Sequence, residues 1–175
     1  MTNDLIAFLG ARLDEDQAWA EACQGHRWQW VRSEDDQVVT ANPAQEECLD
    51  EDSYGISLRS VENPDQEPSP IGHAEGVESS VAGHIVRHDP ARVLRDVSAD
   101  RKLLARYAEA VKEQEEALAA FRVARDEWGS SSEEYADAYK DWSDALLREG
   151  AFLTVIKDRV ARFSDHPGYL QEWAP

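Results

Sequence analysis

The sequence has little sulfur and no long apolar run. It contains two cysteines and one methionine among 175 residues. Cys23 and Cys48 without a secretory signal predict reduced thiols, not a disulfide framework. No segment approaches the roughly 18 apolar residues of a membrane span, and the opening Met1-Thr2-Asn3-Asp4 lacks the basic region of a signal peptide. We therefore expect a cytoplasmic protein with no membrane association.

Motifs of common catalytic sites are also absent. The chain has no Gly-rich phosphate loop, no Gly-x-Ser-x-Gly nucleophile turn and no Cys-x-x-Cys pair. Nothing assigns a nucleophile or a general base, so we expect no catalytic residues and no cofactor. The sequence favours a non-enzymatic protein.

Basic side chains are scarce. The chain has 18 Lys and Arg against 36 Asp and Glu, a net charge of −18, and residues 1–70 alone carry 16 acids against 4 bases. Such a surface repels nucleic acid and anionic membranes and attracts basic partners. The expected partner is a basic protein surface, such as that of a nucleic-acid-binding protein. Simple solubility is the alternative explanation of the charge.

The first third of the chain predicts one helix and three strands. Leu5, Leu9 and Leu13 recur at helical spacing, which predicts a helix over residues 3–23. The aromatic and β-branched segment 27–32 predicts a strand. Segments 37–41 and 53–61 are the expected second and third strands, and the three prolines near residues 63–70 predict a loop or linker.

The second half predicts a helical hairpin. A short helix is expected over residues 77–88, and Asp89-Pro90 predicts the start of a long one. Apolar residues seven apart then define a seam, made of Val97, Leu104, Val111 and Leu118. A second seam runs from Tyr135 to Phe163. Because the turn at Gly129 is short, the two helices must pack antiparallel.

These elements predict an α+β fold that is predominantly helical. Residues 1–90 are expected to form a small antiparallel sheet with the N-terminal helix, and residues 91–163 a long antiparallel two-helix coiled-coil hairpin. Residues 164–175 are expected to pack back on the body.

A carboxylate stripe and an aromatic cluster on the hairpin are the candidate partner-binding residues. Residues three and four apart share one face of a helix. The stripe is Glu134, Asp137, Asp141 and Asp144, and the aromatic residues near the turn are Trp128, Tyr135 and Tyr139. The stripe imitates a row of phosphates, or it is an ordinary solvated helix face with Lys140 and Lys157 mixed in.

A histidine pair is the candidate metal site. His84 and His88 are four apart and Asp89 follows, so a helix would place both imidazoles on one side. The Glu of the zinc-protease motif is absent after His84. A structural role at the end of the helix is the alternative, and the one that we favour.

Three segments resemble a known family: residues 4–16, residues 84–95 with the run His-Ile-Val-Arg-His-Asp-Pro-Ala-Arg-Val-Leu-Arg, and residues 164–173 with Ser-Asp-His-Pro-Gly-Tyr-Leu-Gln-Glu-Trp. They are similar to a family of small uncharacterised proteins from actinobacteria and their phages. The resemblance implies a cytoplasmic phage or prophage accessory protein and no known activity. Many relatives carry a cysteine-rich patch where this chain has the hairpin.

Three functions are therefore open. The first is an acidic interaction protein, in its sharpest form an inhibitor that occupies the basic, nucleic-acid-binding surface of a host or defence protein. The second is a metal-binding protein or metal-dependent enzyme using His84 and His88. The third is a structural or oligomeric protein, such as a homodimer, assembled through the hairpin.

Overall fold

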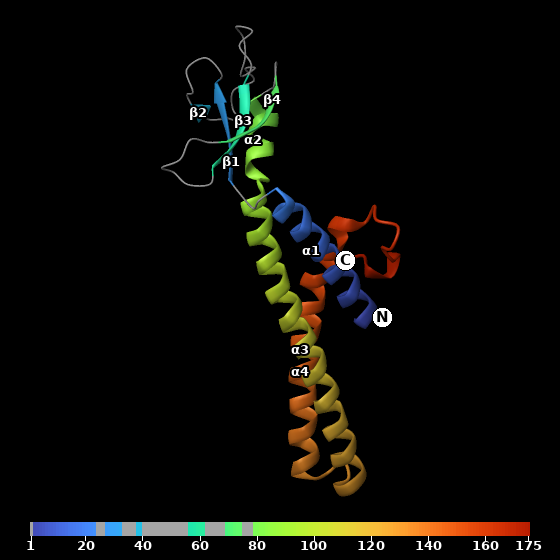
Figure 1. Cartoon of the computed structure of the whole chain (residues 1–175). Helices are drawn as coiled ribbons and strands as arrows, with labels where there is room; N and C mark the ends of the chain where they lie inside the picture. The colour runs from blue at the N-terminus through green and yellow to red at the C-terminus, as the bar shows by residue number, and fades with distance from the viewer. Residues whose placement is uncertain (1, 24–26, 33–37, 40–55, 62–68, 75–78) are drawn as a thin grey trace. The chain divides into compact units, whose positions relative to one another are not determined.

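A computed structural model describes the whole chain except residues 1, 24–26, 33–37, 40–55, 62–68 and 75–78. Most of the predicted proline-rich segment and parts of the expected strands 37–41 and 53–61 lie outside the described residues. The described elements follow one another in the order α1 (Thr2–Ala22), β1 (Arg27–Arg32), β2 (Val38–Val39), β3 (Ile56–Val61), β4 (Ser69–Ala74), α2 (Ser79–Arg87), α3 (Pro90–Trp128) and α4 (Glu133–Val160) (Figure 1). Two 3₁₀-helices, η1 (Ala161–Phe163) and η2 (Gln171–Trp173), follow.

The chain divides into two compact units. One contains residues 1–13 and 98–175, and the other contains residues 14–97. This division cuts across the expected parts 1–90, 91–163 and 164–175, because the first half of α1 and the C-terminal residues both belong with the hairpin.

Four strands of the second unit pair antiparallel in the order β2-β1-β3-β4. Trp30 of β1 lies opposite Val39 on one side and Leu58 on the other. The register shifts between Leu58 and Arg59, where β3 meets β4. The sequence did not predict β4, because its Pro70 belonged to the expected loop; proline is tolerated on a strand at the edge of a sheet.

The sheet is joined to α2 through a tryptophan. The Nε1 of Trp30 donates a hydrogen bond of 3.0 Å to the backbone oxygen of Ala82. Both residues are buried. This bond satisfies the indole N–H, which would otherwise be costly to remove from water.

The predicted fold class needs correction, because the small sheet and the N-terminal helix do not form the core of an α+β body. The described core is helical: all but two of its buried apolar side chains lie on the four α-helices, the exceptions being Trp30 and Trp173. Leu5, Leu9 and Leu13 of α1 are fully buried and belong to the unit of the hairpin. The leucine periodicity predicted a helix correctly but could not say which surface the leucines cover.

The junction between α2 and α3 is made by an N-cap. Oδ1 of Asp89 accepts a hydrogen bond of 2.6 Å from the backbone N–H of Arg92, and Pro90 takes the first position of α3. Proline is pre-organised for that position, where its missing N–H leaves nothing unpaired.

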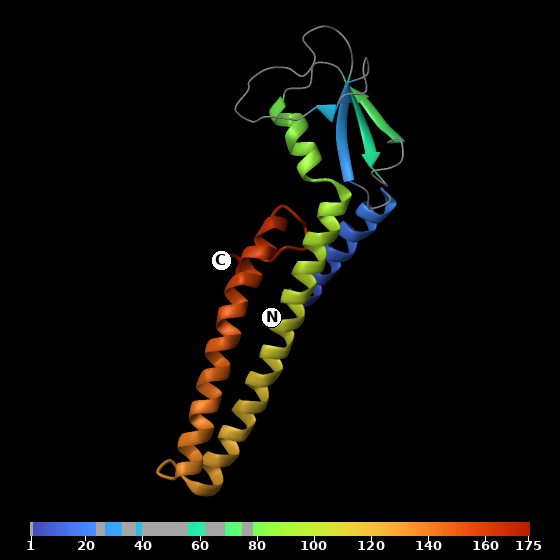
Figure 2. The same ribbon diagram turned by 90° about the vertical axis from the view of Figure 1, so that its left-hand side faces the viewer.

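The predicted antiparallel hairpin is present: α3 and α4 run side by side in opposite directions (Figures 1 and 2). Gly129 begins the turn with φ 74°, in the left-handed region that favours glycine. Ser132 caps α4, since its hydroxyl accepts a hydrogen bond of 3.1 Å from the backbone N–H of Tyr135.

The predicted seam of α3 is buried only in part, at Val97 and at Tyr107, which the seven-residue spacing also assigns to the seam. Tyr107, Ala110 and Ala124 are buried on α3, whereas Leu104, Val111 and Leu118 are only half-buried. Leu104, Val111 and Leu118 therefore lie at the edge of the contact between the two helices and not at its centre.

The first half of α1 and the C-terminal residues pack together within the hairpin unit. The ring of Phe8 lies 4.9 Å from that of Trp173 and 5.4 Å from that of His166. Nη1 of Arg12 is 2.6 Å from Nε2 of His166. Lys157 of α4 donates hydrogen bonds to the backbone oxygens of Glu172 and Ala174, which ties the end of the chain to α4.

No helix in the described part of the chain is both long enough and apolar enough to cross a membrane.

Candidate partner-binding surface of the hairpin

The carboxylate stripe lies on the open surface of α4. Its four residues, Glu134, Asp137, Asp141 and Asp144, are exposed. Within the described residues none of them forms an ion pair. Lys157, which the sequence pattern assigned to this face, instead donates hydrogen bonds to the backbone oxygens of Glu172 and Ala174. The stripe therefore keeps an excess of negative charge, although Lys140 and Arg148 of the same helix lie three or four residues from Asp137 and Asp144.

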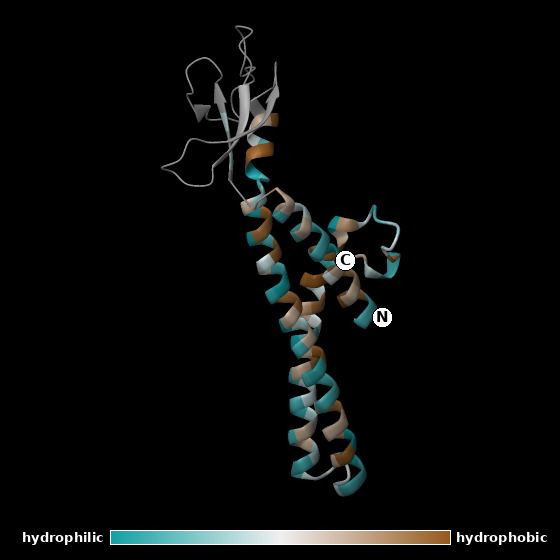
Figure 3. Cartoon of the chain, in the orientation of Figure 1, coloured by the Kyte–Doolittle hydropathy of each residue, from teal (hydrophilic) through white to brown (hydrophobic). Residues whose placement is uncertain are grey.

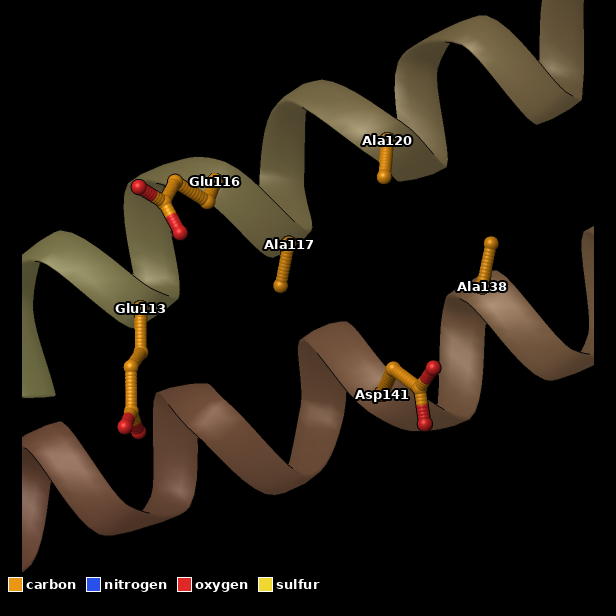
Figure 4. Close-up of a pocket in the computed structure, with 6 residues that line it drawn as sticks. All are labelled: Glu113, Glu116, Ala117, Ala120, Ala138 and Asp141. Carbon is orange, nitrogen blue, oxygen red and sulfur yellow. The ribbon is translucent and has the colours of Figure 1, made fainter.

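Helix α3 adds carboxylates to the same side of the hairpin. Glu113, Glu116 and Asp141 stand around an open groove of about 450 Å³ (Figure 4). Its other lining residues are small: Ala117, Ala120 and Ala138. A floor of methyl groups under a rim of carboxylates suits the aliphatic stem and charged head of a lysine or arginine.

The carboxylates of Glu113 and Glu116 form ion pairs with exposed side chains. Oε2 of Glu113 is 2.5 Å from Nη1 of Arg148, and Oε1 of Glu116 is 3.7 Å from Nζ of Lys112. All four side chains are at least two-fifths exposed, so these pairs contribute little to stability and can exchange for a partner's cation.

Aromatic rings gather near the turn. Phe121 of α3 stacks on Trp142 at 5.2 Å and contacts Tyr135 and Tyr139 at 5.2 and 5.8 Å. Tyr135 is half-buried, whereas Tyr139 is 49% exposed. The cluster holds the two helices together and leaves one phenol ring open to a partner.

Trp128, the third predicted aromatic residue, is the last residue of α3 and is 54% exposed. Figure 3 shows hydrophilic residues interspersed with hydrophobic ones along both helices of the hairpin. An exposed indole beside a charged surface is typical of an interface anchor.

Comparison with known proteins places the chain in a family. The chain belongs to the Family of unknown function (DUF6221). The match covers residues 2–175. No curated protein and no solved structure matches the chain. Membership confirms the resemblance to an uncharacterised family, and since the family description assigns no activity, the functional argument rests on the chemistry of the hairpin.

In this family member the candidate metal residues split into two groups. His84 and His88 are exposed and their ring centroids lie 4.4 Å apart. Asp89 is buried and caps α3. Among the residues that the structure describes, no three or more His, Cys, Asp or Glu side chains gather in a way that could hold a metal ion. Metal binding by the histidine pair stays a prediction.

Sequence reasoning overlooked Glu113 and Glu116 as site residues. They are three apart on α3 and so share a face, which was the available signal. Their place beside Asp141 depends on the register of α3 against α4, which a single helical pattern does not contain.

Proposed function

We propose that this protein is a non-enzymatic interaction protein whose acidic flank binds a basic, nucleic-acid-binding surface of another protein. The acidic flank consists of Glu113, Glu116, Glu134, Asp137, Asp141 and Asp144. The observation that carries the proposal is the exposure of the four α4 carboxylates without any ion pair in the described part of the chain. Lys140 is interleaved with the stripe, three residues from Asp137 and four from Asp144, yet it forms no ion pair with either of them in the described part of the chain.

The spacing of the flank supports imitation of a nucleic acid. From Glu134 to Asp144 the carboxylates extend about 15 Å along α4, at 1.5 Å per residue. Duplex DNA presents one phosphate charge per about 1.7 Å of its axis, counting both strands. A surface that binds phosphates with several lysines or arginines would therefore meet several carboxylates at once.

An inhibitor is the specific form of this proposal. A protein that occupies a basic surface prevents nucleic acid from binding there, and both associations weaken steeply with salt. The resemblance to phage proteins suggests that the target belongs to a host or to its defence against phages, and that the encounter takes place in the cytoplasm.

The test is affinity capture from actinobacterial lysate with the full chain as bait, eluted in salt steps and identified by mass spectrometry. A captured nucleic-acid-binding protein is then purified and titrated with the chain in the presence of a duplex DNA competitor. We expect mutually exclusive binding and release at moderate salt. Binding that survives saturating DNA, or that does not change with salt, would refute the proposal.

A charge-matched pair of variants locates the surface. In the test variant Asp137→Asn, Asp141→Asn and Asp144→Asn remove three charges from the acidic flank. In the control Asp158→Asn, Asp165→Asn and Glu172→Gln remove three exposed charges elsewhere in the same unit. We expect affinity to fall about tenfold or more in the test variant only, since the two variants keep the same net charge. Equal losses would mean that only net charge matters.

A further inference from the structure

A cation of the chain itself stands at one end of the groove in the acidic flank. Nη1 of Arg148 on α4 lies 2.5 Å from Oε2 of Glu113 on α3, and the two side chains are 56% and 42% exposed. Figure 4 shows the Glu113 side chain extending from α3 across the groove toward α4, with Ala117 and Ala138 facing the space between the helices. The carboxylate of Glu113 therefore already accepts a guanidinium group.

Arg148 continues a row of charged residues with the spacing of a coiled coil. Glu134, Asp141 and Arg148 are seven apart on α4, about 10 Å per step, and so share one side of the helix. Asp137 and Asp144 form a second row with the same spacing. Charges repeated every seven residues match those of a second helix that packs alongside, as at the e and g positions of coiled coils. The acidic flank is therefore suited to a helix of its partner.

The floor of the groove allows such a helix to come close. Ala117, Ala120 and Ala138 contribute only methyl groups between α3 and α4. The distance between packed helices depends on the size of the side chains at the contact, and methyl groups keep it short. The aliphatic stem of an arginine can lie over these methyl groups while its guanidinium group reaches a carboxylate at the rim.

The other cations near the groove limit where the partner lies. Lys112 and Lys140 each precede a groove carboxylate by one position, which places them about 100° around their helices from it. Arg106 lies on the same side of α3 as Glu113, seven residues before it. Arg106 and Arg148 thus bound the acidic flank at this end. The partner's cations meet the stretch between Glu113 and the hairpin turn.

We propose that the acidic flank binds an α-helix of the basic partner that carries arginines seven residues apart, and that Arg148 occupies the place of one of these arginines in the unbound chain. The inference rests on the proposed function and names the element of the partner that is bound. Arginine fits better than lysine, because its planar guanidinium group can pair with a carboxylate through two N–H groups. The partner's arginine displaces Arg148 from Glu113, since an exposed ion pair is weak enough to open.

The probe is a synthetic helical peptide of about 20 residues with three arginines seven apart. A second peptide of the same composition has its arginines at steps of five residues, about 140° per step, so that they spread around the helix. Binding of each peptide to the full chain is measured by fluorescence anisotropy in about 0.05 M NaCl. We expect the first peptide to bind about fivefold or more tightly than the second.

Arg148→Gln should tighten binding of the first peptide by about two- to fivefold, because Glu113 is then open without the loss of an ion pair. Arg125→Gln is the matched control, since it removes one positive charge from a similarly exposed pair, 3.0 Å from Asp126 in the same unit. It should change the Kd by less than about twofold. In a chain that also carries Glu113→Gln, the effect of Arg148→Gln should disappear, whereas a general effect of charge would persist.

Circular dichroism confirms that each variant remains helical. Equal binding of the two peptides, or binding of neither, would overturn the assignment of an arginine-bearing helix. A tightening that Arg125→Gln reproduces, or that survives Glu113→Gln, would overturn the role of Arg148. These measurements do not depend on the capture from lysate, so a captured basic protein that competes with DNA would leave the proposed function standing if the peptides failed.

Discussion

The Nε of Arg159 on α4 lies 3.3 Å from Oδ1 of Asp100 on α3, a carboxylate whose side chain is only 6% exposed. Arg162 forms a second ion pair with the other oxygen of the same carboxylate. The two arginines are less than half exposed and reach the buried charge from solvent. This group links the beginning of α3 to the end of α4 across nearly the whole length of the hairpin sequence.

Replacing this carboxylate should destabilise the hairpin unit. Asp100→Asn leaves two arginines without their buried counter-charge, and we expect a loss of about 1–3 kcal/mol, less than for a fully buried pair because the arginines keep access to water. Urea denaturation measures the change. Lys112→Gln, which breaks an exposed pair of 3.7 Å with Glu116, is the control and should cost under about 0.5 kcal/mol. Equal effects would mean that Asp100 has no special structural role.

Two glycine-to-alanine substitutions should have opposite signs. Gly129 has φ 74°, so Gly129→Ala strains the turn and should cost about 1 kcal/mol. Gly150 lies within α4, and an added Cβ there meets no atom within 4 Å. Gly150→Ala should therefore stabilise the protein by about 0.5–1 kcal/mol. Thermal unfolding of the two variants beside the parent chain shows the order, and a Gly129→Ala variant as stable as the parent would contradict the left-handed turn.

Alkaline pH should weaken the hairpin through Tyr107. Burial raises the pKa of Tyr107 above its usual value of 10.0, and the negative charge of Glu149 acts in the same direction, while a hydrogen bond with Thr2 opposes it. The unfolded chain therefore loses this proton first. The contribution of Tyr107 is fully present below about pH 10 and is lost as the pH rises through the folded pKa.

Tyr107→Phe isolates this effect, because the other tyrosines remain. The variant loses the long hydrogen bond of 3.4 Å to Glu149 and the hydrogen bond with Thr2, so its stability at neutral pH should fall by about 1–2 kcal/mol. Its free energy of unfolding should fall less steeply than that of the parent chain between about pH 9 and 11. Parallel curves for the two proteins would show that Tyr107 does not keep its proton in the folded state.

Substitutions of Asp89 distinguish its role as a helix cap from a role as a metal ligand. Asp89→Ala removes the acceptor for the Arg92 N–H and should cost about 1 kcal/mol, whereas Asp89→Asn keeps an acceptor and should cost much less. Added zinc should leave the melting temperature unchanged in all these proteins. A zinc-dependent rise that disappears when His84 and His88 are both changed to Ala would favour the metal site instead.

Local patterns in the sequence were enough to find the helices. The expected helix at 3–23 corresponds to Thr2–Ala22, and the short helix at 77–88 to Ser79–Arg87. The sequence also predicted the cap at Asp89, the turn at Gly129 and the two helical periodicities that define the hairpin. Each depends on residues within a few positions of one another, and so does the carboxylate stripe.

Contacts between residues far apart in the chain could not be predicted from the sequence. The sequence placed Leu5, Leu9 and Leu13 against the sheet, expected Leu104, Val111 and Leu118 to fill the seam, and overlooked β4 because Pro70 resembled part of a linker. It also overlooked the ion pair of Asp100 with Arg162, which are 62 positions apart.

The sequence by itself therefore determined the helices, their caps, the hairpin turn and the excess of negative charge. Only the tertiary structure decided which side of each helix is buried. By setting the register of α3 against α4, it brought Glu113 and Glu116 beside Asp141. Periodicity specifies a face of one helix, but what covers that face depends on contacts between segments far apart in the chain.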